Sequence, residues 1–195
     1  MPVFDGAIMQ NGSEARLTQN LREGDADAFA QIYALHQERV FRYAYHLLGH
    51  REDADDVKQE TFLRAFEARK NFRNDCAVRT WLLAICGNLC RDRIKSWERR
   101  KVRADGGIQA ETAAASAEND PAKLAERADT QEIIRRALHG LPASQREAVV
   151  LHEIEGLDYQ EMAAVLGCTV AGAKLRAFRA RRVLQARVAI LLEMD

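Results

Sequence analysis

The chain has 195 residues, of which 30% are charged and 47% hydrophobic, an ordinary composition for one or two small globular domains. No apolar run reaches the roughly 20 residues that a membrane-spanning helix needs, so we expect no membrane insertion. The first residues contain no basic segment followed by an apolar core, which argues against a signal peptide.

Basic and acidic residues are equal in number, 29 of each, but they are not evenly spread. Basic residues crowd into 91–103 and 174–187, whereas acidic residues dominate 52–60 and much of 105–161. Blocks of opposite sign indicate more than one charged partner, and basic blocks favour nucleic acid. The alternative for any single block is a solvated helix face. Two basic blocks, each on a predicted helix, weaken that alternative.

Apolar residues recur at helical spacing through the first half of the chain. This periodicity predicts helices over 26–48, 51–69 and 79–100. Gly49 is the expected C-terminal stop of the first helix. Acidic residues in the first turns of the second suit the positive end of a helix dipole. The polar stretch 70–78 is expected to be a loop between the second and third helices.

A run of small polar residues without aromatic side chains follows and divides the chain in two. We interpret 104–124 as a flexible linker that leaves the modules on either side free to move. The predicted organisation is an N-terminal extension over 1–19, a helical module over 20–103, the linker, and a second helical module over 125–195. Because strand signals are nearly absent throughout, the predicted fold class is all-α.

Helix start and stop signals are dense in the second module. Residues 124–139 are predicted to form one helix. Another is expected to begin near Pro142 and to stop at Gly156. Asp158 is followed three residues later by Glu161, which predicts a capping box at the start of a short helix.

The short helix is followed by a tight turn at Gly167 and a long helix over about 170–190, which Thr169 can cap. This is the pattern of a DNA-binding helix-turn-helix, whose second helix enters the major groove. Small residues let the two helices approach closely: Ala173, Ala177 and Ala180, followed by Leu184. Arginine binds guanine edges and phosphates in a bidentate manner, which explains the many arginines on this helix. The alternatives are a basic amphipathic helix at the end of the domain and, less favoured, a membrane-surface helix.

Three stretches, in this order, resemble the bacterial extracytoplasmic-function sigma factors, the smallest class of promoter-recognition subunit. The stretch DADDVKQETFLRAF (53–66) looks like the family's acidic polymerase-binding helix. The stretch FRNDCAVRTWLLAICGNLCRDRIKSWERR (72–100) is similar to the loop and helix that open the promoter. The stretch LPASQREAVVLHEIEGLDYQEMAAVLGCTVAGAKLRAFRARRVL (141–184) resembles its reader of the upstream element. The resemblance covers roughly 20–100 and 125–187.

The resemblance implies that the first stretch docks on a coiled coil of the largest polymerase subunits. The candidate docking residues are Asp53, Asp55, Asp56, Gln59 and Glu60. The alternative is again a solvated helix face. Lys58 departs from the family pattern, because a small or apolar residue usually stands there, and this change could weaken or retune the contact.

The resemblance also implies that the loop 70–78 captures a base flipped out of the minus-ten element. Extrusion of a base costs a few kcal/mol, so the pocket must offer stacking and hydrogen bonds to the base edge. Arginines nearby would follow the phosphates. The minus-ten candidates are Phe72, Arg73, Asn74, Asp75, Arg79, Asn88, Arg91 and Arg93. Core packing is an equal alternative for Phe72 and the favoured interpretation of Trp81.

The long helix of the helix-turn-helix would read the minus-thirty-five element. Its candidates are Thr169, Lys174, Leu175, Arg176, Arg179, Arg181 and Arg182. Leu175 stands where the family usually has a small hydroxyl residue, and Ala173 where it has a branched apolar one. Leu175 cannot donate a hydrogen bond, but it could touch a thymine methyl group.

We see no signal for an enzyme or a cofactor. Cys86 and Cys90 lie four residues apart on one helix face and could bind zinc together with Cys76 and a histidine, but this is the less favoured alternative. The chain has no nucleophile–base pair, glycine-rich phosphate loop or paired catalytic carboxylates. The four cysteines, Cys76, Cys86, Cys90 and Cys168, form no C-x-x-C pair, and buried packing is the commoner role of cysteine.

The resemblance implies a bacterial cytoplasmic sigma factor with three partners: core RNA polymerase, promoter DNA and an anti-sigma factor that holds it inactive until a stress signal arrives. Two other classes stay open. A stand-alone helix-turn-helix regulator would dimerise on a palindromic site, but the acidic helix and the loop 70–78 would then have no purpose. A protein that binds only other proteins is the second open class, and the arginine face of the last helix fits it poorly.

Overall fold

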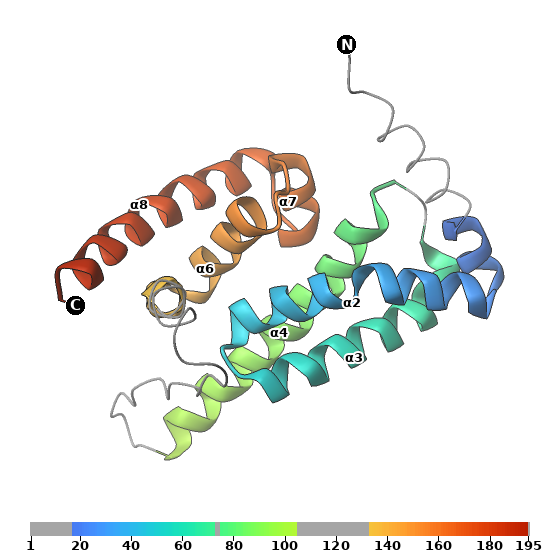
Figure 1. The fold of residues 1–195 in the computed structure, drawn as a ribbon, viewed down its shortest axis with the longest axis horizontal. Helices are drawn as coiled ribbons and strands as arrows, with labels where there is room; N and C mark the ends of the chain where they lie inside the picture. Colours follow the sequence, from blue (N-terminus) through green and yellow to red (C-terminus); the bar gives the residue numbers. More distant parts are fainter. Residues whose placement is uncertain (1–16, 73–74, 105–132, 195) are drawn as a thin grey trace, which may run out of the picture.

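The computed structural model describes residues 17–72, 75–104 and 133–194 (Figure 1). Every regular element within those residues is helical, which confirms the all-α prediction. Short helices cover 17–23 and 133–139. The other elements are α2 (Ala26–Leu48), α3 (Arg51–Ala68), the 3-10 helix η1 (Arg69–Asn71), α4 (Val78–Ala104), α6 (Ala143–Val149), the π-helical η2 (Val150–Ile154), α7 (Tyr159–Leu166) and α8 (Val170–Met194). None of the described helices is long and apolar enough to cross a membrane.

The ends of α2 follow from its capping residues. The carboxylate of Asp25 accepts a hydrogen bond of 2.9 Å from the backbone N–H of Asp27. Gly49 adopts the left-handed conformation with φ of 80°, and its N–H donates to the carbonyl of Tyr45. Glycine adopts this conformation without a Cβ penalty, so the predicted helix 26–48 and its stop are confirmed.

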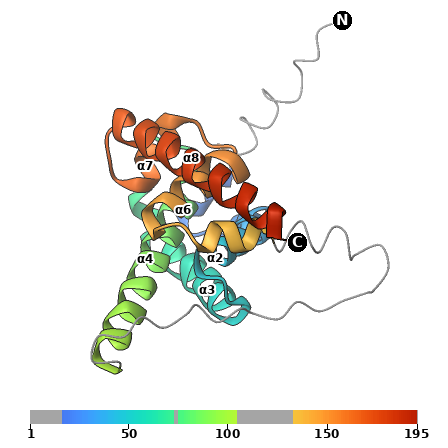
Figure 2. The same ribbon diagram turned by 90° about the vertical axis from the view of Figure 1, so that its left-hand side faces the viewer.

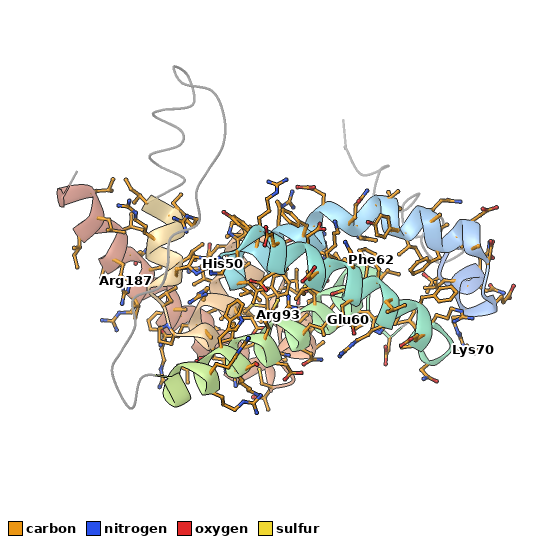
Figure 3. All side chains as sticks on the ribbon, turned by 90° about the horizontal axis from the view of Figure 1, so that it is seen from below. His50, Glu60, Phe62, Lys70, Arg93 and Arg187 are labelled. Atoms are coloured by element: carbon orange, nitrogen blue, oxygen red, sulfur yellow. The ribbon has the colours of Figure 1, made fainter. Side chains whose placement is uncertain are left out.

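Helices α2, α3 and α4 form the front module around an aromatic and aliphatic core. The Phe29 and Phe66 ring centroids lie 5.0 Å apart, and those of Tyr33 and Phe62 lie 4.6 Å apart. These tilted and edge-on contacts are the favoured geometries of aromatic pairs and join α2 to α3. Of the four residues, Phe62 is labelled in Figure 3. Leu83 of α4 is fully buried and helps to close the three-helix bundle.

The second module departs from the sequence prediction in one place. The helix predicted from Pro142 to Gly156 is interrupted, because α6 ends at Val149 and η2 is π-helical. The backbone N–H of Glu155 donates to the carbonyl of Val150 at 2.9 Å, a spacing of five residues. An apolar pattern with a period of 3.6 residues does not distinguish such a π turn from a continuous α-helix.

The predicted helix-turn-helix is formed by α7, a turn and α8. The side chain of Asp158 caps α7, and the carboxylate of Glu161 accepts from the Asp158 N–H, which completes the capping box. Gly167 ends α7 in the left-handed conformation with φ of 60°. Thr169 caps α8 by accepting a 3.1 Å hydrogen bond from the N–H of Gly172. The alanine stripe of α8, consisting of Ala173, Ala177 and Ala180, is buried.

The two modules lie directly against each other (Figures 1 and 2). Helix α7 packs on α4, and α2 contacts both α6 and η2. Their buried apolar side chains form one cluster drawn from both modules. The sequence led us to expect modules that move freely. The extension over 1–16 and nearly all of the predicted linker 104–124 lie outside the described residues.

Candidate nucleic-acid and protein interfaces

The candidate docking face on α3 contains an ion pair of its own. Lys58 Nζ donates to one carboxylate oxygen of Asp55, and Gln59 Nε2 donates to the other at 3.1 Å. The hydrogen bond from Lys58 lowers the pKa of Asp55. Lys58, which departs from the family pattern, therefore neutralises one carboxylate of this face.

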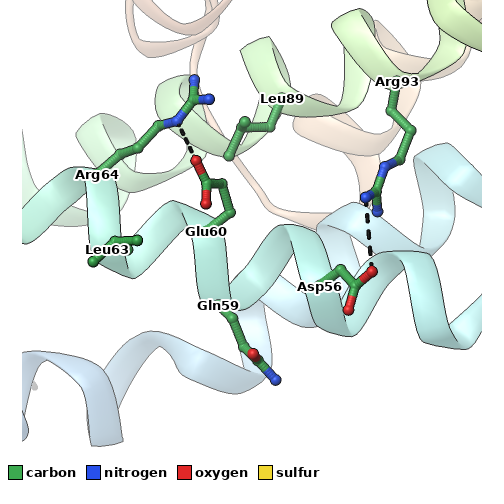
Figure 4. Close-up of a pocket in the computed structure, with 7 residues that line it drawn as sticks. All are labelled: Asp56, Gln59, Glu60, Leu63, Arg64, Leu89 and Arg93. Carbon is green, nitrogen blue, oxygen red and sulfur yellow. Dashed lines mark hydrogen bonds and ion pairs between the residues drawn. The ribbon is translucent and has the colours of Figure 1, made fainter.

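A groove of about 640 Å³ runs between α3 and α4 (Figure 4). It is lined by Asp56, Gln59, Glu60, Leu63, Arg64, Leu89 and Arg93. Three of these are predicted docking residues. Leu63 is 54% exposed and adds an apolar contact that we did not select from the sequence, because an isolated surface leucine carries no signal.

Arg93 belongs to this groove, although the sequence assigned it to DNA. Its guanidinium lies 3.2 Å from Oδ1 of Asp53 and 3.7 Å from Oδ2 of Asp56. It also donates to the Asp53 carbonyl at 3.1 Å. Figures 3 and 4 show the side chain between α4 and α3. Arg93 thus ties the two helices together, and a DNA contact would require these ion pairs to break.

Phe72 packs in the core of the front module. Its side chain is only 3% exposed, and its ring centroid lies 4.6 Å from that of Trp81. This burial favours the core-packing alternative for both residues, and a contact of Phe72 with a flipped base stays a prediction. Asp75 is exposed, whereas Arg73 and Asn74 lie outside the described residues.

Two arginines assigned to minus-ten DNA bind carboxylates of the second module. Arg79 Nη2 donates to Oε1 of Glu161 at 2.8 Å. Arg91 donates to Glu147 and to Oδ1 of the exposed Asn88. The structure therefore brings these cations together with acids that lie more than 50 residues away along the chain, a pairing that no local pattern indicates.

Glu147 is the most enclosed of these carboxylates. Its side chain is 4% exposed and accepts a hydrogen bond of 2.9 Å from the Tyr43 hydroxyl. Burial raises the pKa of Glu147, with Arg91 opposing, and burial together with Glu147 raises the pKa of Tyr43. Gly87 makes room for this carboxylate, because a Cβ there would lie 2.8 Å from Oε1 of Glu147. A buried carboxylate is costly unless it is paired, so Glu147 requires its partners in the front module.

Two further polar contacts join the modules. Arg39 Nε lies 3.2 Å from Oε2 of the buried Glu155, an ion pair without hydrogen-bond geometry. Arg146 donates to the Leu47 carbonyl at 2.6 Å and lies 3.0 Å from Nδ1 of His139. Burial, reinforced by the neighbouring arginines, lowers the pKa of His139 to about 4.

The outer face of α8 is open to solvent. It presents every basic candidate for the minus-thirty-five element: Lys174, Arg176, Arg179, Arg181 and Arg182. Among them Leu175 is 47% exposed and Phe178 is 58% exposed. The sequence did not single out Phe178, which lies between Ala177 and Arg179. Arg181 pairs with Glu153 of the same module, and this hydrogen bond raises its pKa.

All four cysteines are at least partly buried. Cys86 and Cys90 are buried, and Cys86 Sγ lies 3.8 Å from the Val40 carbonyl oxygen. Cys76 and Cys168 are half-buried. Across 17–72, 75–104 and 133–194, no group of three or more His, Cys, Asp or Glu residues is arranged to hold a metal ion.

Comparison with known proteins identifies both modules. The Sigma-70 region 2 family matches residues 32–100, and the Sigma-70 region 4 family matches residues 131–184. The chain is 31% identical over 181 residues to the ECF RNA polymerase sigma-E factor of Escherichia coli (strain K12), covering 90% of this chain and 94% of that protein. It is 29% identical to the RNA polymerase sigma-H factor of Pseudomonas aeruginosa over 192 residues, covering 95% and 98% of the two chains.

Solved structures match both modules together. The sigma factor RpoE of Bartonella quintana, bound to the anti-sigma factor NepR, has a TM-score of 0.66 and 28% identity, with 86% of this chain and 98% of that chain covered. CnrH in complex with the cytosolic domain of CnrY has a TM-score of 0.67 and 28% identity, with 94% and 99% covered.

Proposed function

This chain belongs to the extracytoplasmic-function sigma factors, which direct core RNA polymerase to promoters, and we propose how its two modules divide that task. The front module docks on the polymerase and opens the minus-ten element, and α8 reads the minus-thirty-five element. The observation that carries this proposal is the capped helix-turn-helix, whose outer face presents five exposed cations.

In this proposal, helix α8 both attracts the DNA through its phosphates and contacts its bases. Arg179 and Arg182 contact phosphates or guanine edges, and the capped start of the helix directs backbone N–H groups towards the DNA. Leu175 and Phe178 form an apolar centre between the cations, suited to thymine methyl groups.

The groove between α3 and α4 is the polymerase-docking site. Asp56, Gln59 and Glu60 supply acceptors around the exposed Leu63. A basic helical surface with an apolar side chain complements this arrangement, in agreement with the coiled coil that the family resemblance implies.

The minus-ten strand is contacted by Asn88, Arg79 and Arg91 once the second module has moved away from α4. We further propose that the protein acts in the bacterial cytoplasm, uses no metal or cofactor and has no catalytic activity of its own. An anti-sigma factor holds it inactive, by analogy with the complexes of RpoE with NepR and of CnrH with CnrY.

Co-elution with bacterial core RNA polymerase tests the docking site. We expect the native chain to bind, and the double variant Asp56→Ala/Gln59→Ala to bind at least about tenfold more weakly, as residues at the centre of an interface do. The matched control, Gln31→Ala/Glu67→Ala, changes one exposed amide and one exposed acid outside the groove and retains full binding. Failure of the native chain to bind polymerase would contradict the proposal.

A further inference from the structure

We infer that Lys58 sets how tightly this chain binds core RNA polymerase, because it keeps one carboxylate of the docking face neutralised. The inference rests on the proposed function and deepens it. Lys58 is a positioning residue, since it acts through Asp55, to which its ammonium group donates a hydrogen bond. The docking face of α3 is therefore a weaker ligand for a basic surface than its acid content indicates.

All four carboxylates that we propose for docking already have a cation of the front module beside them. The pairs are Asp53 and Asp56 with Arg93, Asp55 with Lys58, and Glu60 with Arg64. Figure 4 shows two of them across the groove between α3 and α4. A cation of the polymerase must displace a resident cation or share its carboxylate. The strength of docking therefore depends on how easily each resident cation turns away.

Lys58 is the most confined of the three resident cations. The Arg64 side chain is 50% exposed, so it can turn towards solvent when a partner arrives. The Lys58 side chain is only 15% exposed, and its ammonium lies 5.8 Å from the centroid of the Phe41 ring on α2. This distance is within the range of a cation–π contact. Lys58 thus stays beside Asp55 whether or not polymerase is present.

Asp55 is occupied on both of its oxygens. Lys58 donates to one, and Gln59 Nε2 donates to the other at 3.1 Å. The guanidinium of Arg51 lies over the same Phe41 ring, 5.6 Å from its centroid. The hydrogen bond from Lys58, together with Gln59 and the charge of Arg51, lowers the pKa of Asp55. A polymerase cation that approaches this carboxylate meets resident positive charge, which opposes its approach.

The exposed Leu63 then has a larger share in docking than the acids around it suggest. Its side chain stands in the groove that Gln59 also lines. Salt screens attraction between exposed charges and leaves apolar contact nearly unaffected. We therefore expect polymerase binding by the native chain to depend only weakly on salt.

The test variant is Lys58→Met, which removes the charge and keeps a long apolar stem against Phe41. Lys58→Arg keeps the charge. The matched control is Lys70→Met, which removes an exposed lysine of η1 outside the groove. Because an ion pair of this kind adds little stability, all three variants should unfold in urea at nearly the native concentration.

The measurement is the dissociation constant of the labelled full-length chain with core RNA polymerase across a potassium chloride series. We expect Lys58→Met to bind about fivefold more tightly than the native chain at low salt, the size of one favourable exposed charge interaction. The difference should shrink as salt rises. Lys58→Arg and Lys70→Met should bind as the native chain does.

A double-mutant cycle with Asp55→Asn shows whether Lys58 acts through Asp55. In the Asp55→Asn background, Lys58→Met should change the affinity by less than about twofold, because the carboxylate that it would release is gone. The same gain in both backgrounds would mean direct repulsion between Lys58 and polymerase and would overturn the inference.

The native chain separates the two possible failures. If it does not bind core polymerase at any salt concentration, the proposed function fails and the inference fails with it. If it binds but Lys58→Met binds no more tightly at low salt, the docking site stands and only the role of Lys58 is refuted.

Discussion

The two surfaces that we propose to bind DNA, on α4 and on α8, are both rich in arginine, but the first is covered by the other module and the second is exposed. On α4, Arg79 and Arg91 are half-buried and paired with acids from the other module. On α8, the cations are exposed, and Arg181 pairs with Glu153 of its own module. The difference teaches that arginine content alone does not define a nucleic-acid surface, because the acids brought to it by the tertiary structure decide whether it is available.

The largest expected difference is in the free energy of unfolding, between a variant that breaks an ion pair on α4 and one that breaks an ion pair on α8. Arg91→Met leaves Glu147 buried without its cation, so we expect a loss of about 3 kcal/mol in the free energy of unfolding. Arg181→Met breaks the exposed pair with Glu153 and should leave stability nearly unchanged. Urea unfolding followed by circular dichroism measures both. Equal losses would mean that the modules are not packed together in solution.

A smaller effect should appear in duplex binding by the free protein. Arg179→Ala/Arg182→Ala removes two exposed cations and should lower the slope of log affinity against log salt by about 2. Arg79→Ala/Arg93→Ala should leave that slope unchanged, because these cations face carboxylates. Fluorescence anisotropy with a labelled random duplex across a potassium chloride series provides the slopes. Equal reductions would show that both surfaces contact duplex DNA in the free protein.

The smallest effect concerns pH. Burial in the packed state lowers the pKa of His139 to about 4, whereas in separated modules it should return towards about 6.5. Opening therefore takes up a proton, and the packed state should lose stability as pH falls from about 6.5 towards 4. The groups facing His139 are Arg135, Arg146, His46 and His50, all of which oppose its protonation.

The control for this pH effect is His139→Gln, measured by scattering over the same pH range. Burial raises the pKa values of Glu147 and Glu155, which favours the packed state at low pH and so acts in the opposite sense. The relevant quantity is therefore the difference in radius of gyration between the native chain and the variant at each pH. A radius of gyration that follows the same pH curve in both would rule out a contribution from His139.

Helix boundaries could be predicted because their causes are local. Gly49, the Asp158–Glu161 capping box, Gly167 and the Thr169 cap all act within a few residues of the backbone groups that they satisfy. The exception is η2, where a π turn replaces a continuous helix and leaves the apolar periodicity almost unchanged.

The candidate sites were predicted less completely, since exposure and pairing depend on distant residues. Phe72 and Phe178 are both aromatic residues next to basic ones, yet the first is buried against Trp81 and the second is exposed. Arg93 was assigned to DNA because it lies in a basic block, but α3 places two aspartates beside it.

The sequence by itself determined the helices, their caps, the helix-turn-helix and the family, because these depend on short-range periodicity and on motifs that are contiguous along the chain. Only the tertiary structure decided which arginine side chains are exposed and available to bind DNA. The pairings of Glu147 and Glu161 with α4 join residues 56 and 82 positions apart. Such contacts arise from the packing of one module on the other, which no local pattern encodes.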